Sequence, residues 1–195
     1  MRLGSIEFIN SLPVDLGILS RAVSLEAKVF QGSPSFLNEK IMNSELDVSP
    51  VSALHYAMHW KDLFLLPDLS ISSKTSVQSV LLFSRYELKD LKDKEILLTS
   101  KGRTTPALLE IICRFRYGFS PRFKALEGDF SRFFNNKEEN AALLLIGDDA
   151  LVAKKRFESP GVGVIDLAEE WKLWTQCPIV FAVWVARSWQ SKHLP

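Results

Sequence analysis

The feature of this sequence that most constrains its fold is a repeated alternation of strand-like and helix-like patterns. Nine segments show the alternating or continuous apolar pattern typical of strands. They lie at about residues 2–9, 26–31, 45–49, 63–72, 78–84, 95–99, 141–146, 162–166 and 178–186. Helical patterns lie between some of them, at 34–43, 105–117 and 148–157. Because parallel neighbouring strands need a crossover that is usually a helix, the alternation predicts an α/β fold with largely parallel sheets.

One stretch breaks this alternation and indicates a division of the chain. Within residues 63–84, two extended segments follow each other with only the polar loop 72–76 between them. We interpret this stretch as a crossing between two lobes, and the later apolar strand from Pro178 as a return to the first lobe. The expected architecture is a two-lobed clamshell. Its first lobe would comprise residues 1–84 plus 177–195, its second lobe residues 85–176, and the ligand cleft would lie between them.

Charge and apolar patterning exclude several classes of partner. The 24 Lys and Arg residues nearly balance the 23 Asp and Glu residues and are interspersed with them, so no basic stripe for a nucleic acid is expected. The longest apolar run, Ile179–Ala186, is far shorter than the ~20 residues that span a bilayer. The N-terminus has no pattern of a signal peptide. We therefore expect a cytoplasmic protein without a membrane partner.

The residues at strand-to-helix junctions indicate where a ligand could bind. In α/β sheets, ligands bind beyond the carboxyl ends of strands, where the N–H groups of the next helix are free. The predicted junctions are residues 10–13, 47–52, 99–106 and 146–149. Three of the four are rich in hydroxyl or amide donors, which suit a carboxylate or a phosphate. Helix capping is the favoured explanation of any single junction, but the repetition across both lobes favours a ligand.

Other possible motifs are weaker. His55 and His59 have the i, i+4 spacing of a zinc pair, but neither the intervening glutamate of a zinc protease nor a third nearby ligand accompanies them, so a packed or surface pair is favoured. Cys113 and Cys177 are 64 positions apart and form no CxxC motif. No Ser-His-Asp order, GxSxG elbow or Walker loop is visible in the sequence. We expect neither a metal nor a redox cofactor, and activity that survives chelation.

Six segments in order along nearly the whole chain resemble a known family. They are 8–13 (Phe-Ile-Asn-Ser-Leu-Pro), 46–52 (Leu-Asp-Val-Ser-Pro-Val-Ser), 66–73 (Leu-Pro-Asp-Leu-Ser-Ile-Ser-Ser), 79–85 (Ser-Val-Leu-Leu-Phe-Ser-Arg), 145–151 (Leu-Ile-Gly-Asp-Asp-Ala-Leu) and 181–187 (Phe-Ala-Val-Trp-Val-Ala-Arg). Together they resemble the chorismate dehydratase family of the futalosine route to menaquinone. The resemblance implies a fold like that of type II periplasmic binding proteins. It also implies loss of water from chorismate to give 3-[(1-carboxyvinyl)oxy]benzoate.

Within this resemblance, two sets of site residues are expected. The candidate catalytic residues are Asn10, Ser79 and Asp148. The candidate substrate-binding residues are Ser11, Ser49, Ser52, Thr104, Thr105 and Gly147. Two explanations of proton removal stay open. Asp148 could be the base, or the enolpyruvyl carboxylate of the substrate could remove the proton while Asn10 holds that carboxylate or the departing hydroxyl.

The chain departs from the family pattern in two places. Family members continue past the return strand with further helices, whereas this chain stops at Pro195. We therefore expect either a shortened form or self-association as a homo-oligomer through the first lobe, beside Ile179–Trp189. The loop before the 105–117 helix contains Lys101 and Arg103 where small residues are usual. These two could bind a carboxylate or lie in solvent.

Three alternative functions remain at this stage. The related dihydroxynaphthoate synthase is expected to use a histidine of its second lobe as a base, but this chain has no histidine between His59 and His193. A solute receptor is opposed by the lack of a signal-peptide pattern. A cytosolic sensor that binds a small carboxylate without catalysis has the same sequence requirements as the enzyme.

Overall fold

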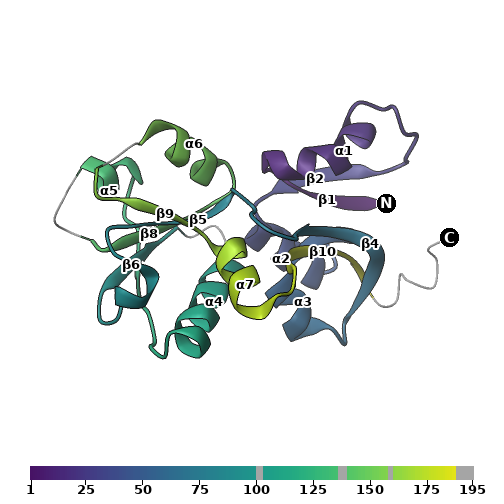
Figure 1. The fold of residues 1–195 in the computed structure, drawn as a ribbon. Coiled ribbons are helices and arrows are strands. Elements are labelled where there is room, and N and C mark those ends of the chain that lie inside the picture. The colour runs from purple at the N-terminus through teal and green to yellow at the C-terminus, as the bar shows by residue number, and fades with distance from the viewer. Residues whose placement is uncertain (100–102, 136–139, 158–159, 188–195) are drawn as a thin grey trace. The chain divides into compact units, whose positions relative to one another are not determined.

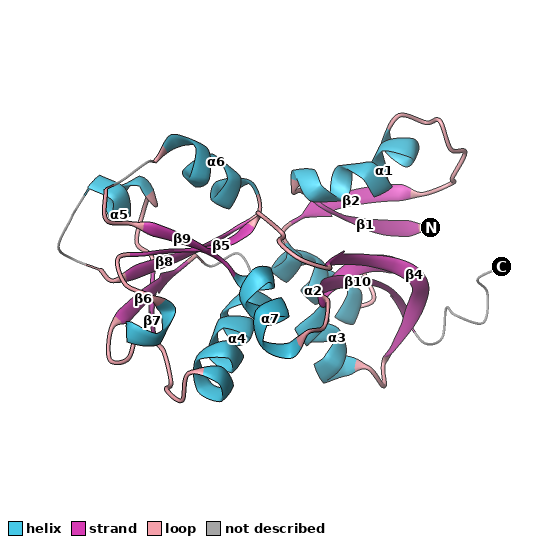
Figure 2. Ribbon diagram, viewed as in Figure 1, coloured by secondary structure: helices cyan, strands magenta, loops and turns pink. Residues whose placement is uncertain are grey.

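The computed structural model describes residues 1–99, 103–135, 140–157 and 160–187, which form two α/β units (Figures 1 and 2). The first unit comprises Met1–Ser72 and the described parts of 101–104 and 180–195. The second unit comprises residues 73–100 and 105–179, where they are described. None of the described helices is long and apolar enough to cross a membrane.

The first unit contains a mixed five-stranded sheet of order β2-β1-β3-β10-β4. Its strands are β1 (Arg2–Ile6), β2 (Lys28–Gly32), β3 (Val48–Ser52), β4 (Leu63–Ser73) and β10 (Ile179–Arg187). Its helices are α1 (Leu12–Leu19), α2 (Pro34–Met42) and α3 (Ala53–His59), and the 3₁₀ turn η1 (Ile9–Ser11) precedes α1. β1 is parallel to β2 and β3, whereas β10 is antiparallel to β3. The apolar strand expected to return to the first lobe is therefore β10, next to β3.

The second unit contains another mixed five-stranded sheet, of order β7-β6-β8-β5-β9. Its strands are β5 (Val80–Ser84), β6 (Glu95–Leu98), β7 (Arg122–Ala125), β8 (Ala142–Ile146) and β9 (Gly163–Asp166). Its helices are α4 (Thr104–Ile111), α5 (Ser131–Asn135), α6 (Asp148–Arg156) and α7 (Leu167–Thr175), with the 3₁₀ turn η2 (Leu88–Asp90) and the π-turn η3 (Ile112–Arg116). The helix expected over 105–117 is thus α-helical only as far as Ile111. Gly118 then ends η3 with a φ of 75°.

The division between the units differs from the expected one. β5 was expected in the first lobe, but it pairs antiparallel with both β8 and β9 of the second sheet, so the boundary falls after Ser72 rather than after Ser84. All five residues of β5 are buried, which a strand inside a sheet achieves and a linker does not. β5 is reached through extended chain rather than a helix, so no crossover requires it to be parallel. The sheets are therefore mixed rather than largely parallel.

Each unit has its own apolar core. In the first unit, adjacent residues of β10 serve opposite faces of the sheet, as the strand period of two requires. Val185 is 0% exposed and packs with Leu37 and Val51, whereas Trp184 is 4% exposed and packs with Leu3. The apolar side chains of β10, beside which we expected self-association, are thus largely buried inside their own unit. In the second unit, a cluster that includes Phe83, Phe133 and Leu143 fills the core.

Candidate functional site

In the second unit, the pairing of β5 with β8 brings together three of the expected site residues. Val80 lies opposite Ile146, so Ser79 before β5 faces Gly147 and Asp148 after β8. The Gly147 N–H donates to the Ser79 carbonyl at 2.8 Å. Gly147 is the N-cap of α6 and has a φ of 61° and a ψ of −139°, a conformation that glycine adopts without strain. Asp148 begins α6 and is exposed.

The expected hydroxyl residues fall into two groups. Ser11, Ser79 and Thr105 are 1%, 6% and 5% exposed. Within the described ranges, their hydroxyls make no hydrogen bond, and the Ser11 Oγ is fully enclosed. For the Ser11 Oγ this costs free energy, because it is a buried polar group without a partner, and a ligand can supply that partner. Asn10, beside Ser11 in η1, is exposed.

The second group consists of hydroxyls that the fold itself uses. The Ser49 Oγ donates to the Pro50 carbonyl at 3.0 Å, and the side chain is 0% exposed in the packing of β3 beside Gly4. The Ser52 Oγ caps α3 by accepting from His55 N at 3.3 Å and also accepts from the Asn38 amide. The Thr104 Oγ1 accepts a long bond of 3.4 Å from Leu54 N. These three residues have a structural role that the sequence pattern alone did not separate from ligand binding.

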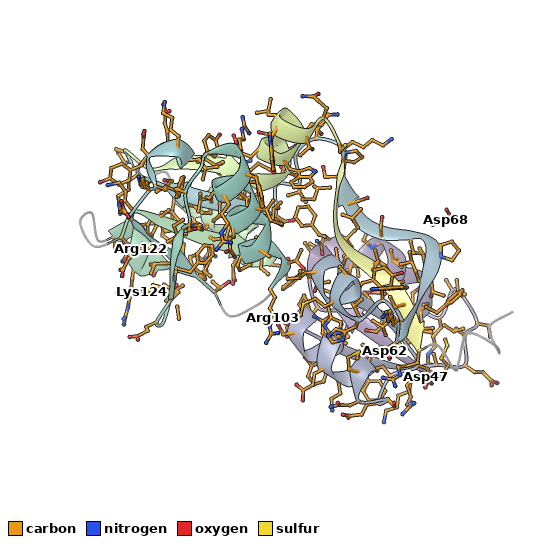
Figure 3. The ribbon with its side chains drawn as sticks, turned by 90° about the horizontal axis from the view of Figure 1, so that it is seen from below. Asp47, Asp62, Asp68, Arg103, Arg122 and Lys124 are labelled. Carbon is orange, nitrogen blue, oxygen red and sulfur yellow. The ribbon has the colours of Figure 1, made fainter. Side chains whose placement is uncertain are left out.

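The junction expected at 47–52 also changes because β3 begins at Val48. Asp47 precedes the strand and pairs with Arg2, accepting from its backbone N at 2.6 Å and from its Nε at 3.1 Å. This interaction holds β3 to the start of β1 (Asp47 is labelled in Figure 3). Arg103 is exposed before α4 (Figure 3), whereas Lys101 lies outside the described residues.

Asp15 is a buried acid that sequence reasoning missed. It is 6% exposed on α1, four residues after Ser11, and accepts from the Ser5 Oγ at 2.7 Å. Burial raises the pKa of its carboxyl, and the Ser5 bond opposes part of that rise. The sequence feature that could have identified it is its position as the only acidic residue in the apolar stretch Leu12–Leu19.

Asp166 is a second acid that sequence reasoning missed. It ends β9 and is 9% exposed, and its carboxylate accepts backbone hydrogen bonds from two separate parts of the second unit. No pattern in the sequence pairs position 166 with residues almost ninety positions earlier.

The histidine pair lies on α3 with its ring centroids 4.5 Å apart. Burial, together with the positive charges of His59 and Arg103, lowers the pKa of His55. In the described ranges, no cluster of three or more His, Cys, Asp or Glu side chains could hold a metal ion.

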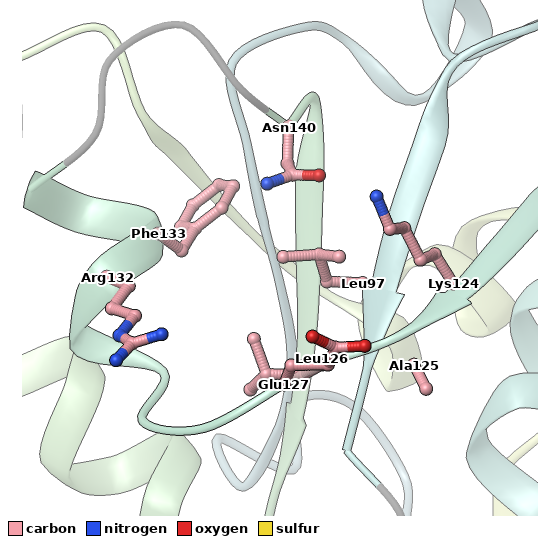
Figure 4. A pocket seen from close by; sticks show the side chains of 8 residues that line it. All are labelled: Leu97, Lys124, Ala125, Leu126, Glu127, Arg132, Phe133 and Asn140. Atoms are coloured by element: carbon pink, nitrogen blue, oxygen red, sulfur yellow. The ribbon is translucent and has the colours of Figure 1, made fainter.

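A pocket of about 420 Å³ lies in the second unit (Figure 4). Its lining is formed by Leu97, Lys124, Ala125, Leu126, Glu127, Arg132, Phe133 and Asn140. Figure 4 shows the cationic side chains of Arg132 and Lys124 on opposite sides of the opening. The Asn140 Oδ1 is buried and has no hydrogen-bond partner among the residues that the structure describes. None of the expected site residues lines this pocket.

The fold defines the class of protein to which these units belong. The protein AF1704 from Archaeoglobus fulgidus has a similar structure, with a TM-score of 0.70 and 18% identity, over 96% of this chain and 67% of that chain. The periplasmic aliphatic sulphonate-binding protein SsuA from Escherichia coli has a TM-score of 0.67 and 12% identity, over 99% of this chain and 66% of that chain. The fold is that of periplasmic binding proteins.

Sequence comparison then identifies the family. The family model described as menaquinone biosynthesis matches residues 1–193, and the chain belongs to this family. The chorismate dehydratase of Thermus thermophilus is 32% identical over 173 residues. The match covers 82% of this chain and 61% of that relative, so the chain spans less than two thirds of the relative's length.

Proposed function

We propose that this chain has chorismate dehydratase activity and removes water from chorismate to give 3-[(1-carboxyvinyl)oxy]benzoate. The observation that supports this most is the 32% identity to a chorismate dehydratase over 173 residues, within a family match over residues 1–193. The residues of the second unit also support it. Ser79 and Thr105 have buried side chains whose hydroxyls make no hydrogen bond to the described part of the chain, and the Gly147 N–H bonds the Ser79 carbonyl.

The reaction requires stabilisation of negative charge. Loss of the proton at C3 and of the hydroxyl at C4 completes the aromatic ring, and the electron pair left at C3 is delocalised towards the ring carboxylate. Donors directed at that carboxylate lower the barrier, and removal of one preorganised donor costs about 2–4 kcal/mol in the transition state. We assign this role to Ser79 and Thr105, and we assign the binding of the substrate to Asn10 and Ser11.

For proton removal, we favour the enolpyruvyl carboxylate of the substrate as the base. The competing base is Asp148, which begins α6. Asp148→Asn separates the two routes. Near-normal turnover supports the substrate-assisted route, whereas lost turnover with intact binding identifies Asp148 as the base.

The direct test is incubation of the purified chain with chorismate, followed by mass and ultraviolet spectra of the product. Formation of the carboxyvinyloxy benzoate supports the enzyme. Binding without dehydration favours a carboxylate sensor. Ser79→Ala and Thr105→Ala should each reduce turnover by about 30- to 1000-fold. Ser84→Ala is the matched control, because Ser84 is also a buried serine, at the other end of the same strand, and bonds the Tyr86 carbonyl at 2.7 Å.

We further propose a cytoplasmic location, consistent with a biosynthetic family, and self-association through the first unit. The second proposal is supported by exposed apolar side chains on α1, where Leu12, Val14, Leu16 and Leu19 are each at least 40% exposed.

A further inference from the structure

The Asp166 carboxylate connects two segments of the second unit that are far apart in sequence. Its Oδ1 accepts from Ala168 N at 2.9 Å and Glu169 N at 3.4 Å, which caps α7. Its Oδ2 accepts from Val77 N at 3.0 Å and Gln78 N at 2.7 Å. We call these four hydrogen bonds the Asp166 bridge. One carboxylate thus fixes the start of a helix and the two residues before Ser79.

The segment held by the Asp166 bridge has an unfavourable backbone conformation. Gln78 has a φ of 60°, in the left-handed region that residues with a Cβ adopt at a cost. Its side chain is exposed, so side-chain packing does not enforce this conformation. The two bonds to Oδ2 bind the amides of this turn directly.

The turn fixes the backbone of Ser79, because Ser79 follows Gln78 directly. Upstream, the Asp166 bridge fixes the amides of Val77 and Gln78, and downstream the Ser79 carbonyl accepts the Gly147 N–H at 2.8 Å. The backbone of Ser79 is held on both sides, while the hydroxyl of its buried side chain makes no hydrogen bond within the described ranges. A donor fixed in this way needs no reorganisation when charge develops on a substrate.

We propose that Asp166 is a positioning residue that orients Ser79 through the left-handed turn at Gln78. This inference rests on the proposed function, which gives the Ser79 hydroxyl its role. Helix capping alone does not account for a carboxylate at this position, because single hydroxyls, of Ser33 and Ser52, cap α2 and α3 in the same chain. The second carboxylate oxygen bonds the segment before Ser79 and takes no part in the cap.

The main test uses Asp166→Asn. Asparagine is as favourable as aspartate at an N-cap, but it has one carbonyl oxygen and one NH₂ group. It can cap α7 or accept from Val77 and Gln78, but it cannot do both. We expect kcat for chorismate to fall by about 10- to 100-fold, with KM changed by less than about threefold. Asp129→Asn is the matched control, because Asp129 accepts from Ser131 N at 2.8 Å before α5, away from Val77 and Gln78, and this variant should retain turnover.

Two substitutions at Gln78 test whether the left-handed turn positions Ser79, and they leave the α7 cap unchanged. Gln78→Val should reduce kcat, because a β-branched residue is disfavoured at positive φ. Gln78→Gly adopts this conformation freely, so adding it to Asp166→Asn should restore much of the lost kcat. If the loss in Asp166→Asn came only from a weakened helix cap, Gln78→Gly would restore nothing, and the proposal would be overturned.

Amide hydrogen exchange tests the Asp166 bridge without relying on turnover. In Asp166→Asn, the amides of Val77 and Gln78 should lose protection, whereas in Asp129→Asn they should keep it. Unchanged protection in Asp166→Asn overturns the inference, and so does lost protection with wild-type kcat. Absence of turnover in the unmodified chain would instead contradict the proposed function, while the exchange experiment would still test the Asp166 bridge.

Discussion

Asp15 shows how a single side chain can impose a pH dependence on the first unit. Burial raises the pKa of its carboxyl relative to the unfolded chain, against the hydrogen bond from Ser5. A group with a raised folded-state pKa contributes stability that is complete below its unfolded pKa of about 3.9 and is lost as the pH rises through the folded-state pKa. The raised pKa of Asp15 therefore lowers the free energy of unfolding as the pH rises above the unfolded pKa.

We predict that Asp15→Asn is at least as stable as the unmodified protein at neutral pH. The amide removes the cost of a buried charge and keeps an oxygen for the Ser5 hydroxyl. The free energy of unfolding should also depend less on pH between about 4 and 7. Urea unfolding across this range measures both effects. A variant destabilised by more than about 1 kcal/mol at neutral pH would show that the fold requires the ionised carboxylate.

The donor to Asp15 gives a separate prediction. Ser5→Ala leaves the buried carboxyl without its hydrogen bond and should lower the free energy of unfolding by about 1–3 kcal/mol. Ser20→Ala is the control, since the exposed Ser20 hydroxyl bonds the Leu16 carbonyl at the end of the same helix. Its effect should stay within about 0.5 kcal/mol. Equal effects of the two substitutions in urea unfolding would contradict the assigned role of Ser5.

At the scale of elements, the π-turn η3 places Cys113 in the apolar interior of the second unit. The thiol is 0% exposed, and burial raises its pKa to about 12, with a smaller contribution from the charge of Glu110. Near pH 8, only about one molecule in ten thousand then carries the reactive thiolate. Cys177 is exposed, and the chain has two cysteines in all.

We predict that a thiol reagent modifies one cysteine rapidly in the native protein. Cys177 should react within the dead time of the measurement. Cys113 should react only when urea unfolds the second unit. Removing the exposed thiol by Cys177→Ser should abolish the rapid phase. Fast modification of both thiols in folded protein would show that η3 opens much more readily than its burial indicates.

The junction between β8 and α6 depends on the conformation of Gly147. Its φ of 61° and ψ of −139° are strained for any residue with a Cβ, so Gly147→Ala should cost about 1–3 kcal/mol of stability. The same change disturbs the N–H that bonds the Ser79 carbonyl, so turnover of chorismate should fall as well. Gly118→Ala is the matched control, because Gly118 also has a positive φ, of 75°, but does not bond Ser79. Both variants should be destabilised in a thermal melt, and only Gly147→Ala should lose activity.

At the scale of the whole molecule, the exposed apolar side chains of α1 bear on association. Leu16 is 53% exposed and lies on the same helix as Leu12 and Leu19, and apolar surface gathered in this way is typical of interfaces. We predict that the protein self-associates with rising concentration and that Leu16→Glu shifts it towards the monomer. Leu173→Glu on α7 is the control, since Leu173 is 63% exposed in the other unit. Sedimentation at several concentrations would contradict the prediction if the unmodified chain stayed monomeric.

The fold class, nearly all of the described strands and the helices α2, α4 and α6 could be predicted from the sequence, whereas α1 and α7 were missed. These features follow from the spacing of apolar side chains and from caps such as Ser33, which act over a few residues. β7 was missed because it is a four-residue strand at the edge of the sheet, with the basic residues Arg122 and Lys124 (Figure 3). The ordered family segments also led to Ser79, Gly147 and Asp148, which the structure brings together.

Only the tertiary structure decided which strands share a sheet and which polar side chains the fold itself uses. β5 and β10 have much the same apolar pattern, yet β5 is buried between β8 and β9 while β10 pairs with β3. Ser49 and Ser11 look equivalent in sequence, but one bonds its own backbone and the other is enclosed without a partner among the described residues. Asp166 and Gln78 are 88 positions apart and meet only because β9 pairs with β5. Local patterns do not encode such contacts, because the free energy that selects them comes from burying whole strands together.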